Sequence, residues 1–326
     1  MTVRVTTLKG PRAAWYYTHE LRRELKPELE VGAYYTREEE PPGRWIGMQA
    51  ENFGLGVEPD QLLLLMAGLD PNTGEQLGRA YGESSARGYD VTFNAPKSVS
   101  LLAEFADDEV RTHVLAAHDL AVDRVLGFVE GQAHTRVTVQ QVTSVVDTQG
   151  LCVAGFRQHT SRAGDPHVHT HAVVIAKVQD GRGRWYALDA RMIKHDQRTL
   201  SALYHSSLRT ELTRSLGVQW RTPDNGIAEL AGISDEVLAR FSTRTDQLEQ
   251  RLQDKLDRFR VTFEREPTDK ERWRLEREAA VDSRPTRASV PRADELSVQW
   301  RRQLSALGLT PEQLTAEVVG DRKSVV

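Results

Sequence analysis

Three histidines alternate along one short stretch of the sequence, at His167, His169 and His171. Residues two apart on a β-strand point to the same face of a sheet, so the three imidazoles would share a face. An apolar run at 172–175 follows them, and an apolar strand has no packing reason to gather imidazoles. The stretch predicts a divalent-metal site, which would suit a zinc hydrolase, a nuclease or a surface that binds metal without function.

The segments around the histidines predict how they are held. Residues 151–159 and 168–178 have strand character and flank a Gly-Asp-Pro sequence, so an antiparallel hairpin is expected. Upstream, an alternating strand would place Asp90, Thr92 and Asn94 on one polar face. Asp90 is therefore either a polar residue at a strand end or a member of a buried site.

Composition narrows the class of protein. The 326 residues are 39% hydrophobic and 28% charged, which is typical of a soluble globular chain. No apolar run approaches the roughly 18 residues that span a bilayer, and the N-terminus lacks a secretory signal, so we expect a cytoplasmic protein without membrane insertion. The single cysteine, Cys152, excludes internal disulfides and cysteine-cluster metal sites.

Charge is unevenly distributed along the chain. The net charge is -4, yet residues 151–220 contain ten Lys and Arg against five Asp and Glu. This basic segment is the one that contains the histidines. It indicates either a polyanionic substrate beside the metal or an ordinary solvated basic face.

The order of expected elements predicts an α+β fold in which helices pack on one face of a mainly antiparallel sheet. The sequence has no internal repeat and no phosphate-binding loop of the Gly-x-x-x-x-Gly-Lys type. Expected strands are 3–8, 90–94, 136–147, 151–159 and 168–178, and expected helices are 59–68, 107–131, 196–216, 233–263 and 268–280. Capping boxes are expected to begin at Thr268 and at Thr310.

Three separated motifs stand out: Trp15-Tyr16-Tyr17, then Asp90-Val-Thr-Phe-Asn-Ala-Pro-Lys-Ser, then Thr160-Ser-Arg-x-x-Asp-Pro-x-x-His169-Thr-His171. Together they resemble the MobF class of conjugative relaxases, a branch of the HUH endonucleases. The similarity extends from about residue 10 to Gln247 and keeps the family's order.

The resemblance implies a metal-dependent, strand-specific nick at a plasmid transfer origin, in which a tyrosine becomes bound to the 5′ phosphate. By position Tyr16 matches the first catalytic tyrosine, with Tyr17 a possible alternative, and Tyr34 and Tyr35 match the second cluster. Asp90 matches the family's acidic residue, and it would orient a metal histidine or accept the tyrosine proton. His169 and His171 match two metal ligands.

The resemblance also implies a two-layer sandwich, with a five-stranded antiparallel sheet backed by helices and the histidines at its centre. We expect a catalytic core at 1–230 and a helical extension at 231–326 that packs on the DNA site or closes over it. Implied partners are single-stranded origin DNA, accessory relaxosome proteins and a coupling protein. Family members commonly continue into a helicase, so this sequence suggests a truncated or minimal relaxase.

The third metal ligand is where the sequence departs from the family, which usually has His-x-Thr-Ser-Arg. Gln158 occupies the histidine position and His159 follows it. Adjacent strand residues face opposite ways, so His159 would need a bulge to turn inward, and His167 is a third option. Register favours Gln158. A site with two histidines and one oxygen ligand favours Mg or Mn, although Zn is possible.

Candidate DNA contacts come mainly from the basic segment, because arginine and lysine bind phosphates. They are Lys97, Arg157, Arg162, Lys177, Arg184 and Arg191.

Three other functions compete with a relaxase. A rolling-circle replication or transposition nuclease would use the same HUH chemistry on another substrate. A metal-dependent hydrolase of small molecules would form no covalent DNA adduct. A catalytically weak module that binds single-stranded DNA would result if Gln158 had abolished cleavage.

Overall fold

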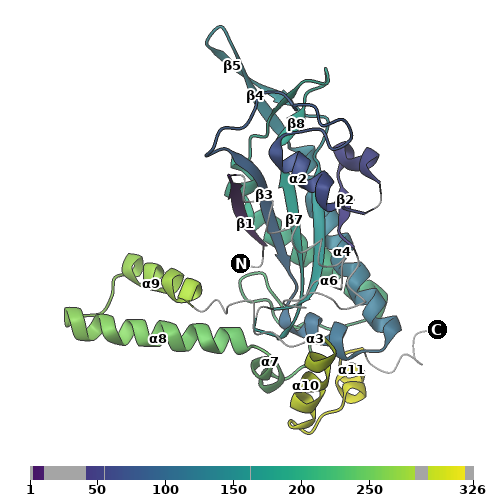
Figure 1. Ribbon diagram of the computed structural model, residues 1–326. Helices are drawn as coiled ribbons and strands as arrows, with labels where there is room; N and C mark the ends of the chain where they lie inside the picture. The colour runs from purple at the N-terminus through teal and green to yellow at the C-terminus, as the bar shows by residue number, and fades with distance from the viewer. Residues whose placement is uncertain (1–2, 11–41, 55, 162, 283–292, 320–326) are drawn as a thin grey trace.

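The computed structural model describes residues 3–10, 42–54, 56–161, 163–282 and 293–319 (Figure 1). Its centre is a five-stranded sheet in the order β1-β3-β7-β6-β2, in which every neighbouring pair is antiparallel. The strands are β1 (Val3–Lys9), β2 (Arg44–Ile46), β3 (Ala86–Asn94), β6 (Val153–Thr160) and β7 (Pro166–Ile175). The predicted α+β fold and the central position of the histidine strand are confirmed.

Helices cover one face of the sheet. The helices α4 (Asp108–Gly131) and α6 (Gln197–Leu216) pack there, on apolar side chains such as Phe93 of β3 and Val174 of β7. Asp107 caps α4 by accepting a hydrogen bond from the Val110 amide at 2.8 Å, which satisfies one of the exposed donors at the helix start. Burial of this helix-covered face provides most of the hydrophobic core.

The opposite face is covered only in part. The 3-10 helix η1 (Met48–Phe53) and the helix α2 (Pro59–Ala67) form a smaller apolar cluster there with Val173 and Ile175 of β7. Two residues back along the same face of β7 is His171, where the apolar side chains give way to polar ones. The cluster therefore lies beside the histidines on this face of the sheet.

Two hairpins extend the sheet at the end away from α3 (Lys97–Phe105) (Figure 1). In one of them, β8 (Lys177–Gln179) pairs antiparallel with β9 (Trp185–Ala187). The single strand expected at 136–147 is wrong, because the chain reverses there between β4 (His134–Val139) and β5 (Val142–Asp147). Gln140 and Gln141 both have positive φ, and neither residue type signals such a turn.

The helices beyond residue 230 divide into two groups. The single helix expected at 233–263 is two helices in the structure. The first, α7 (Asp235–Arg240), ends before the buried Phe241, and the second is α8 (Thr243–Phe263). α8 pairs with α9 (Asp269–Asp282) around a small apolar cluster of their own, and Figure 1 shows this pair extending away from the sheet. α10 (Ala293–Ser305) and α11 (Pro311–Val319) instead pack into the main core.

Both expected capping boxes are present. Thr268 Oγ1 accepts from the Glu271 amide at 3.4 Å while Glu271 accepts from the Thr268 amide at 2.9 Å. Thr310 and Gln313 exchange the corresponding pair of hydrogen bonds at 3.3 and 2.9 Å. Among the described residues, no helix is long and apolar enough to cross a membrane.

Two buried histidines in the helix layer predict an acid-sensitive fold. Burial lowers the pKa of His205 from 6.5 to about 4, and burial lowers the pKa of His118 well below its usual value. The unfolded chain takes up these protons near pH 6.5, whereas the folded chain takes them up only at lower pH. The free energy of unfolding is therefore highest above pH 6.5 and falls as the pH drops toward 4. Lowering the pH from 7 to 4 should reduce the free energy of unfolding by about 3 kcal/mol through His205 alone, and urea unfolding measures this change.

The matched variants for this measurement are His205→Gln and His195→Gln. The first should reduce the pH dependence between pH 6.5 and 4, whereas the second, whose side chain is 89% exposed, should keep it. Equal pH dependence in His205→Gln and the unmodified chain would show that acid sensitivity arises elsewhere.

Candidate functional site

The site begins with a carboxylate that holds one histidine. Asp90 of β3 and His171 of β7 lie on adjacent strands, with His171 directly opposite Thr92 in the register. The His171 Nδ1 lies 2.9 and 3.1 Å from the two carboxylate oxygens of Asp90, and Thr92 Oγ1 donates to the same carboxylate at 3.3 Å. This pairing directs the other ring nitrogen, Nε2, away from Asp90 as the atom that can bind a metal.

A second histidine is oriented by the backbone. The His169 Nδ1 lies 3.0 Å from the carbonyl oxygen of His167, so its Nε2 is also the nitrogen that can bind a metal. The His167 ring stacks on His169 with centroids 4.8 Å apart, and its Nε2 lies 3.0 Å from Asn94 Oδ1. His167 therefore contacts both Asn94 and His169, as expected for three histidines on one strand face.

His169, His171 and Gln158 are the residues predicted to bind a metal ion at the centre of the sheet. In the described part of the chain, no group of three or more His, Cys, Asp and Glu side chains is arranged to hold a metal ion. Gln158 of β6 lies directly opposite His169 in the register, and is therefore on the same face as His169 and His171. Two imidazoles and an amide oxygen are a donor set that fits a divalent ion.

His159 lies at an irregularity in the sheet. The β6–β7 register shifts between Gln158 and Thr160, so a bulge of the kind that could turn His159 inward does occur there. His159 is 6% exposed. Register assigns a face to Gln158 but not to His159, and the choice between them stays a prediction.

Two alanine substitutions distinguish these ligands. Gln158→Ala should weaken Mn²⁺ binding and Mn²⁺-supported DNA cleavage by about 10-fold or more, because a site of two imidazoles holds a hard ion poorly. His159→Ala should leave Mn²⁺ affinity and Mn²⁺-supported cleavage within about twofold of the unmodified chain. Calorimetric titration with Mn²⁺ and a cleavage assay on single-stranded DNA measure these effects, and the reverse pattern would assign the ligand to His159.

On the helix-covered side of β7, a buried hydrogen-bond network joins the sheet to its helices. His118 of α4 lies 2.7 Å from Tyr204 of α6 through Nδ1 and 2.7 Å from Thr170 of β7 through Nε2. Thr170 separates His169 from His171 and faces the helices. This network holds β7 in place against the helix layer. Because its buried polar groups are paired, it rigidifies the strand that carries both histidines.

The structure argues against two of the expected DNA contacts. Lys177 is 3% exposed and donates to the Arg79 carbonyl while its ammonium lies over the Tyr81 ring, so it stabilises the fold. Arg157 pairs with Asp119 of α4, on the helix-covered face opposite to the histidines. Neither side chain is exposed on the sheet face that carries His169 and His171.

The other expected DNA contacts stay predictions. Lys97 follows β3, and its ammonium donates to the Pro166 carbonyl at 2.8 Å. Arg184 and Arg191 are exposed, and each is paired with an aspartate, Asp180 and Asp189 respectively. Arg162 and the tyrosines at 16, 17, 34 and 35 lie outside the described residues.

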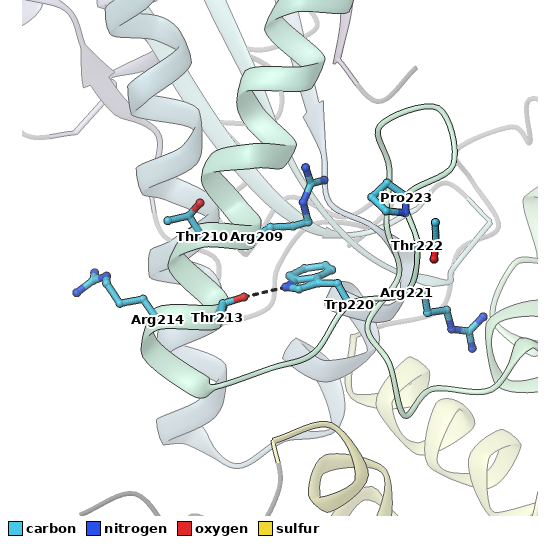
Figure 2. Close-up of a pocket in the computed structure, with 8 residues that line it drawn as sticks. All are labelled: Arg209, Thr210, Thr213, Arg214, Trp220, Arg221, Thr222 and Pro223. Carbon is cyan, nitrogen blue, oxygen red and sulfur yellow. Dashed lines mark hydrogen bonds between the residues drawn. The ribbon is translucent and has the colours of Figure 1, made fainter.

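A basic groove that the sequence did not predict lies beside α6. The groove, called the α6 groove below, has a volume of about 690 Å³ and is open to solvent. Figure 2 shows its lining, which comprises Arg209, Thr210, Thr213, Arg214, Trp220, Arg221, Thr222 and Pro223. The missed signal was Asn225-Gly226, a typical hairpin turn that folds the segment after α6 back on itself.

Comparison with known proteins gives consistent matches. The family model described as TrwC relaxase matches residues 11–307. The multifunctional conjugation protein TraI of Escherichia coli is 32% identical over 244 residues, which are 69% of this chain and 13% of TraI. The chain thus spans a small part of that curated relative.

Solved structures match along almost the whole chain. A metal-bound structure of the conjugative relaxase TrwC in complex with oriT DNA has a TM-score of 0.77 and 29% identity, covering 95% of this chain and 99% of that one. TrwC complexed with a 27-mer DNA comprising the recognition hairpin and the cleavage site has a TM-score of 0.75 and 28% identity, with the same coverage. The five-stranded sheet and its helices are therefore an arrangement that these structures share.

Proposed function

Because the chain belongs to the TrwC relaxase family, we propose that it cleaves one strand of a plasmid transfer origin and later rejoins it. The observation that carries this proposal is the polar face at the sheet centre. There Asp90 holds His171 at 2.9 Å, and His169 and Gln158 lie alongside. These donors would suit a divalent ion beside a basic chain segment, which fits a phosphodiester substrate.

Tyr16 is the proposed nucleophile. Its phenolic oxygen forms a bond to the scissile phosphorus while the bond from phosphorus to the 3′ oxygen breaks, which leaves a 5′-phosphotyrosine and a 3′ hydroxyl. One phosphodiester replaces another, so the strand can be rejoined without ATP. A phenol with an ordinary pKa near 10 is a weak nucleophile at neutral pH, so the site must assist proton removal.

The residues of the polar face position the reacting groups. His169 and His171 would hold the ion through Nε2, with Gln158 as the proposed third ligand, and Asp90 fixes the tautomer and orientation of His171. The ion, proposed to be Mg²⁺ or Mn²⁺ with Zn²⁺ as an alternative, would polarise the scissile phosphate. Asp90 is also the proposed acceptor for the tyrosine proton.

Further parts of the proposal concern partners and the second tyrosines. Tyr34 or Tyr35 would perform a second strand transfer, with Tyr17 an alternative nucleophile. The α8–α9 pair would close over the bound strand. Accessory relaxosome proteins and a coupling protein would act with the chain in the cytoplasm.

Covalent capture of DNA tests the proposal. The chain is incubated with a single-stranded oligonucleotide that spans its plasmid's transfer origin, with Mn²⁺ or with EDTA, and denaturing gel electrophoresis detects a protein–DNA adduct. We expect an adduct with Mn²⁺ that shows a 5′ linkage after nuclease trimming. Tight binding without any adduct would instead support a single-strand binding module, and cleavage only at a replication origin would support a rolling-circle nuclease.

A further inference from the structure

The α6 groove is basic although the chain as a whole is acidic. Three arginines, Arg209, Arg214 and Arg221, line it, and the lining includes no carboxylate. Arg214 is paired with Glu211 and Arg221 with Asp235. Arg209 donates to the Gly226 carbonyl at 3.0 Å, and no carboxylate within the described residues forms a salt bridge with it. Arg209 is therefore the arginine best placed to take an anionic ligand.

An indole lies in the same groove. Trp220 packs against the main apolar core, and its Nε1 donates to Thr213 Oγ1 at 3.0 Å. Figure 2 shows the ring extending between the α6 side chains and the following loop, with Arg209 beside it. A ring held by packing and by one hydrogen bond offers a fixed surface on which a nucleobase can stack at little entropic cost.

The wall of the groove is rigid. The segment after α6 is a short hairpin in which the backbone amide of Arg221 donates to the Glu229 carbonyl at 2.9 Å. Its turn places Asn225 at φ 49° and Gly226 at φ 82°, the left-handed conformations of a tight two-residue turn. The groove is therefore largely formed before any ligand binds.

The hairpin is also hydrogen-bonded to α3, the helix that follows β3. Ser98, at the start of α3, donates its amide to Glu229 at 2.8 Å, and its hydroxyl accepts from the Leu230 amide at 2.8 Å. α3 follows directly on β3, which carries Asp90. Hydrogen bonds and the short connection from α3 to β3 thus link the groove to the strand that carries Asp90, although α6 packs on the opposite face of the sheet.

We propose that the α6 groove is a second binding site for single-stranded DNA, in which a base stacks on Trp220 and the adjacent phosphate pairs with Arg209. The proposal rests on the proposed relaxase function and extends it to a segment of the strand outside the cleavage site. An indole face beside a guanidinium matches a base joined to a phosphate, and such contacts tolerate any sequence. An acidic peptide would match the arginines but not the indole.

Binding of a fluorescent 30-nucleotide thymidine homopolymer, measured by anisotropy in EDTA, tests the site without cleavage. Trp220→Ala should weaken binding about 10-fold, since loss of one stacked base has an effect of that order, and Trp220→Phe should retain most of the affinity. Arg209→Gln should weaken binding and reduce the slope of log K against log salt by about 1, as loss of one phosphate contact does.

Matched controls lie outside the groove and outside the α8–α9 pair. Phe128→Ala removes an exposed aromatic side chain of α4 and Arg198→Gln an exposed arginine of α6, and both should bind the homopolymer as the unmodified chain does. Adduct formation on a short origin oligonucleotide should be unchanged in all groove variants. Arg209→Gln, on the helix surface, serves if Trp220→Ala fails to fold in a thermal unfolding check.

Two outcomes would overturn the proposal. One is binding within twofold of the unmodified chain for both Trp220→Ala and Arg209→Gln while adduct formation is normal. The other is that polyglutamate binds the chain and loses this binding in Arg209→Gln, while binding of the thymidine homopolymer is unchanged. That result would assign the groove to an acidic protein. A chain that forms no adduct but loses homopolymer affinity in Trp220→Ala would contradict the proposed function and support the groove.

Discussion

Tyr16→Phe is expected to abolish the covalent protein–DNA adduct while leaving DNA binding within about threefold of the unmodified chain. The substitution removes one oxygen, the atom proposed to attack phosphorus, and retains the ring. Loss of a nucleophile removes the reaction path itself, so we expect cleavage to fall at least about 10³-fold, below detection on a denaturing gel. Anisotropy with the same oligonucleotide in EDTA measures binding separately.

The neighbouring tyrosines supply the controls for this result. Tyr17→Phe should keep full adduct formation on a single-stranded origin oligonucleotide. The double variant Tyr34→Phe, Tyr35→Phe should keep the first cleavage and lose only a second transfer to an added strand. An undiminished adduct in Tyr16→Phe that disappears in Tyr17→Phe would move the nucleophile by one residue and leave the rest of the site as described.

The alternation of polar residues made the centre of the fold predictable. Asp90, Thr92 and Asn94 were assigned to one strand face and His167, His169 and His171 to another, and in the structure the two strands are adjacent, with Thr92 opposite His171. Period-two patterns survive folding because a strand has only two faces. The pairing of β3 with β7 was not predicted, because no local signal specifies which strands of a sheet are neighbours.

The errors arose where a turn or a break lacked its usual residues. Gln140 and Gln141 adopt positive φ without glycine or asparagine, so the β4–β5 hairpin was read as one strand. Phe241 ends α7 because its side chain is fully buried, a tertiary effect that no helix propensity reports. Lys177 and Arg157 are predicted DNA contacts, and the sequence could not show that Lys177 lies over Tyr81 or that Arg157 pairs with Asp119, because both partners lie far away in the sequence.

The predicted metal residues can be ranked by their effects. His171→Ala is expected to lower Mn²⁺ affinity by more than about 100-fold, because loss of a ligand exceeds the roughly 10- to 100-fold loss typical of its hydrogen-bonding partners. Cleavage at sub-saturating Mn²⁺ should fall at least in proportion. Calorimetry with Mn²⁺ and single-turnover cleavage measure the two effects, and unchanged metal affinity in His171→Ala would remove the proposed metal site.

Asp90→Asn separates the two roles proposed for Asp90. An asparagine can still accept one hydrogen bond from His171 Nδ1, so metal affinity should fall only about 10-fold, and excess Mn²⁺ should restore the cleavage rate if orientation of His171 is the whole role. If Asp90 also accepts the tyrosine proton, the rate at saturating Mn²⁺ stays low and increases with pH as hydroxide replaces the missing base. Asp123→Asn, a carboxylate paired with Arg44 away from the histidines, should change neither quantity. The pH dependence therefore decides between the roles, because a carboxylate that only orients a ligand gives a rate that becomes normal once the metal site is full.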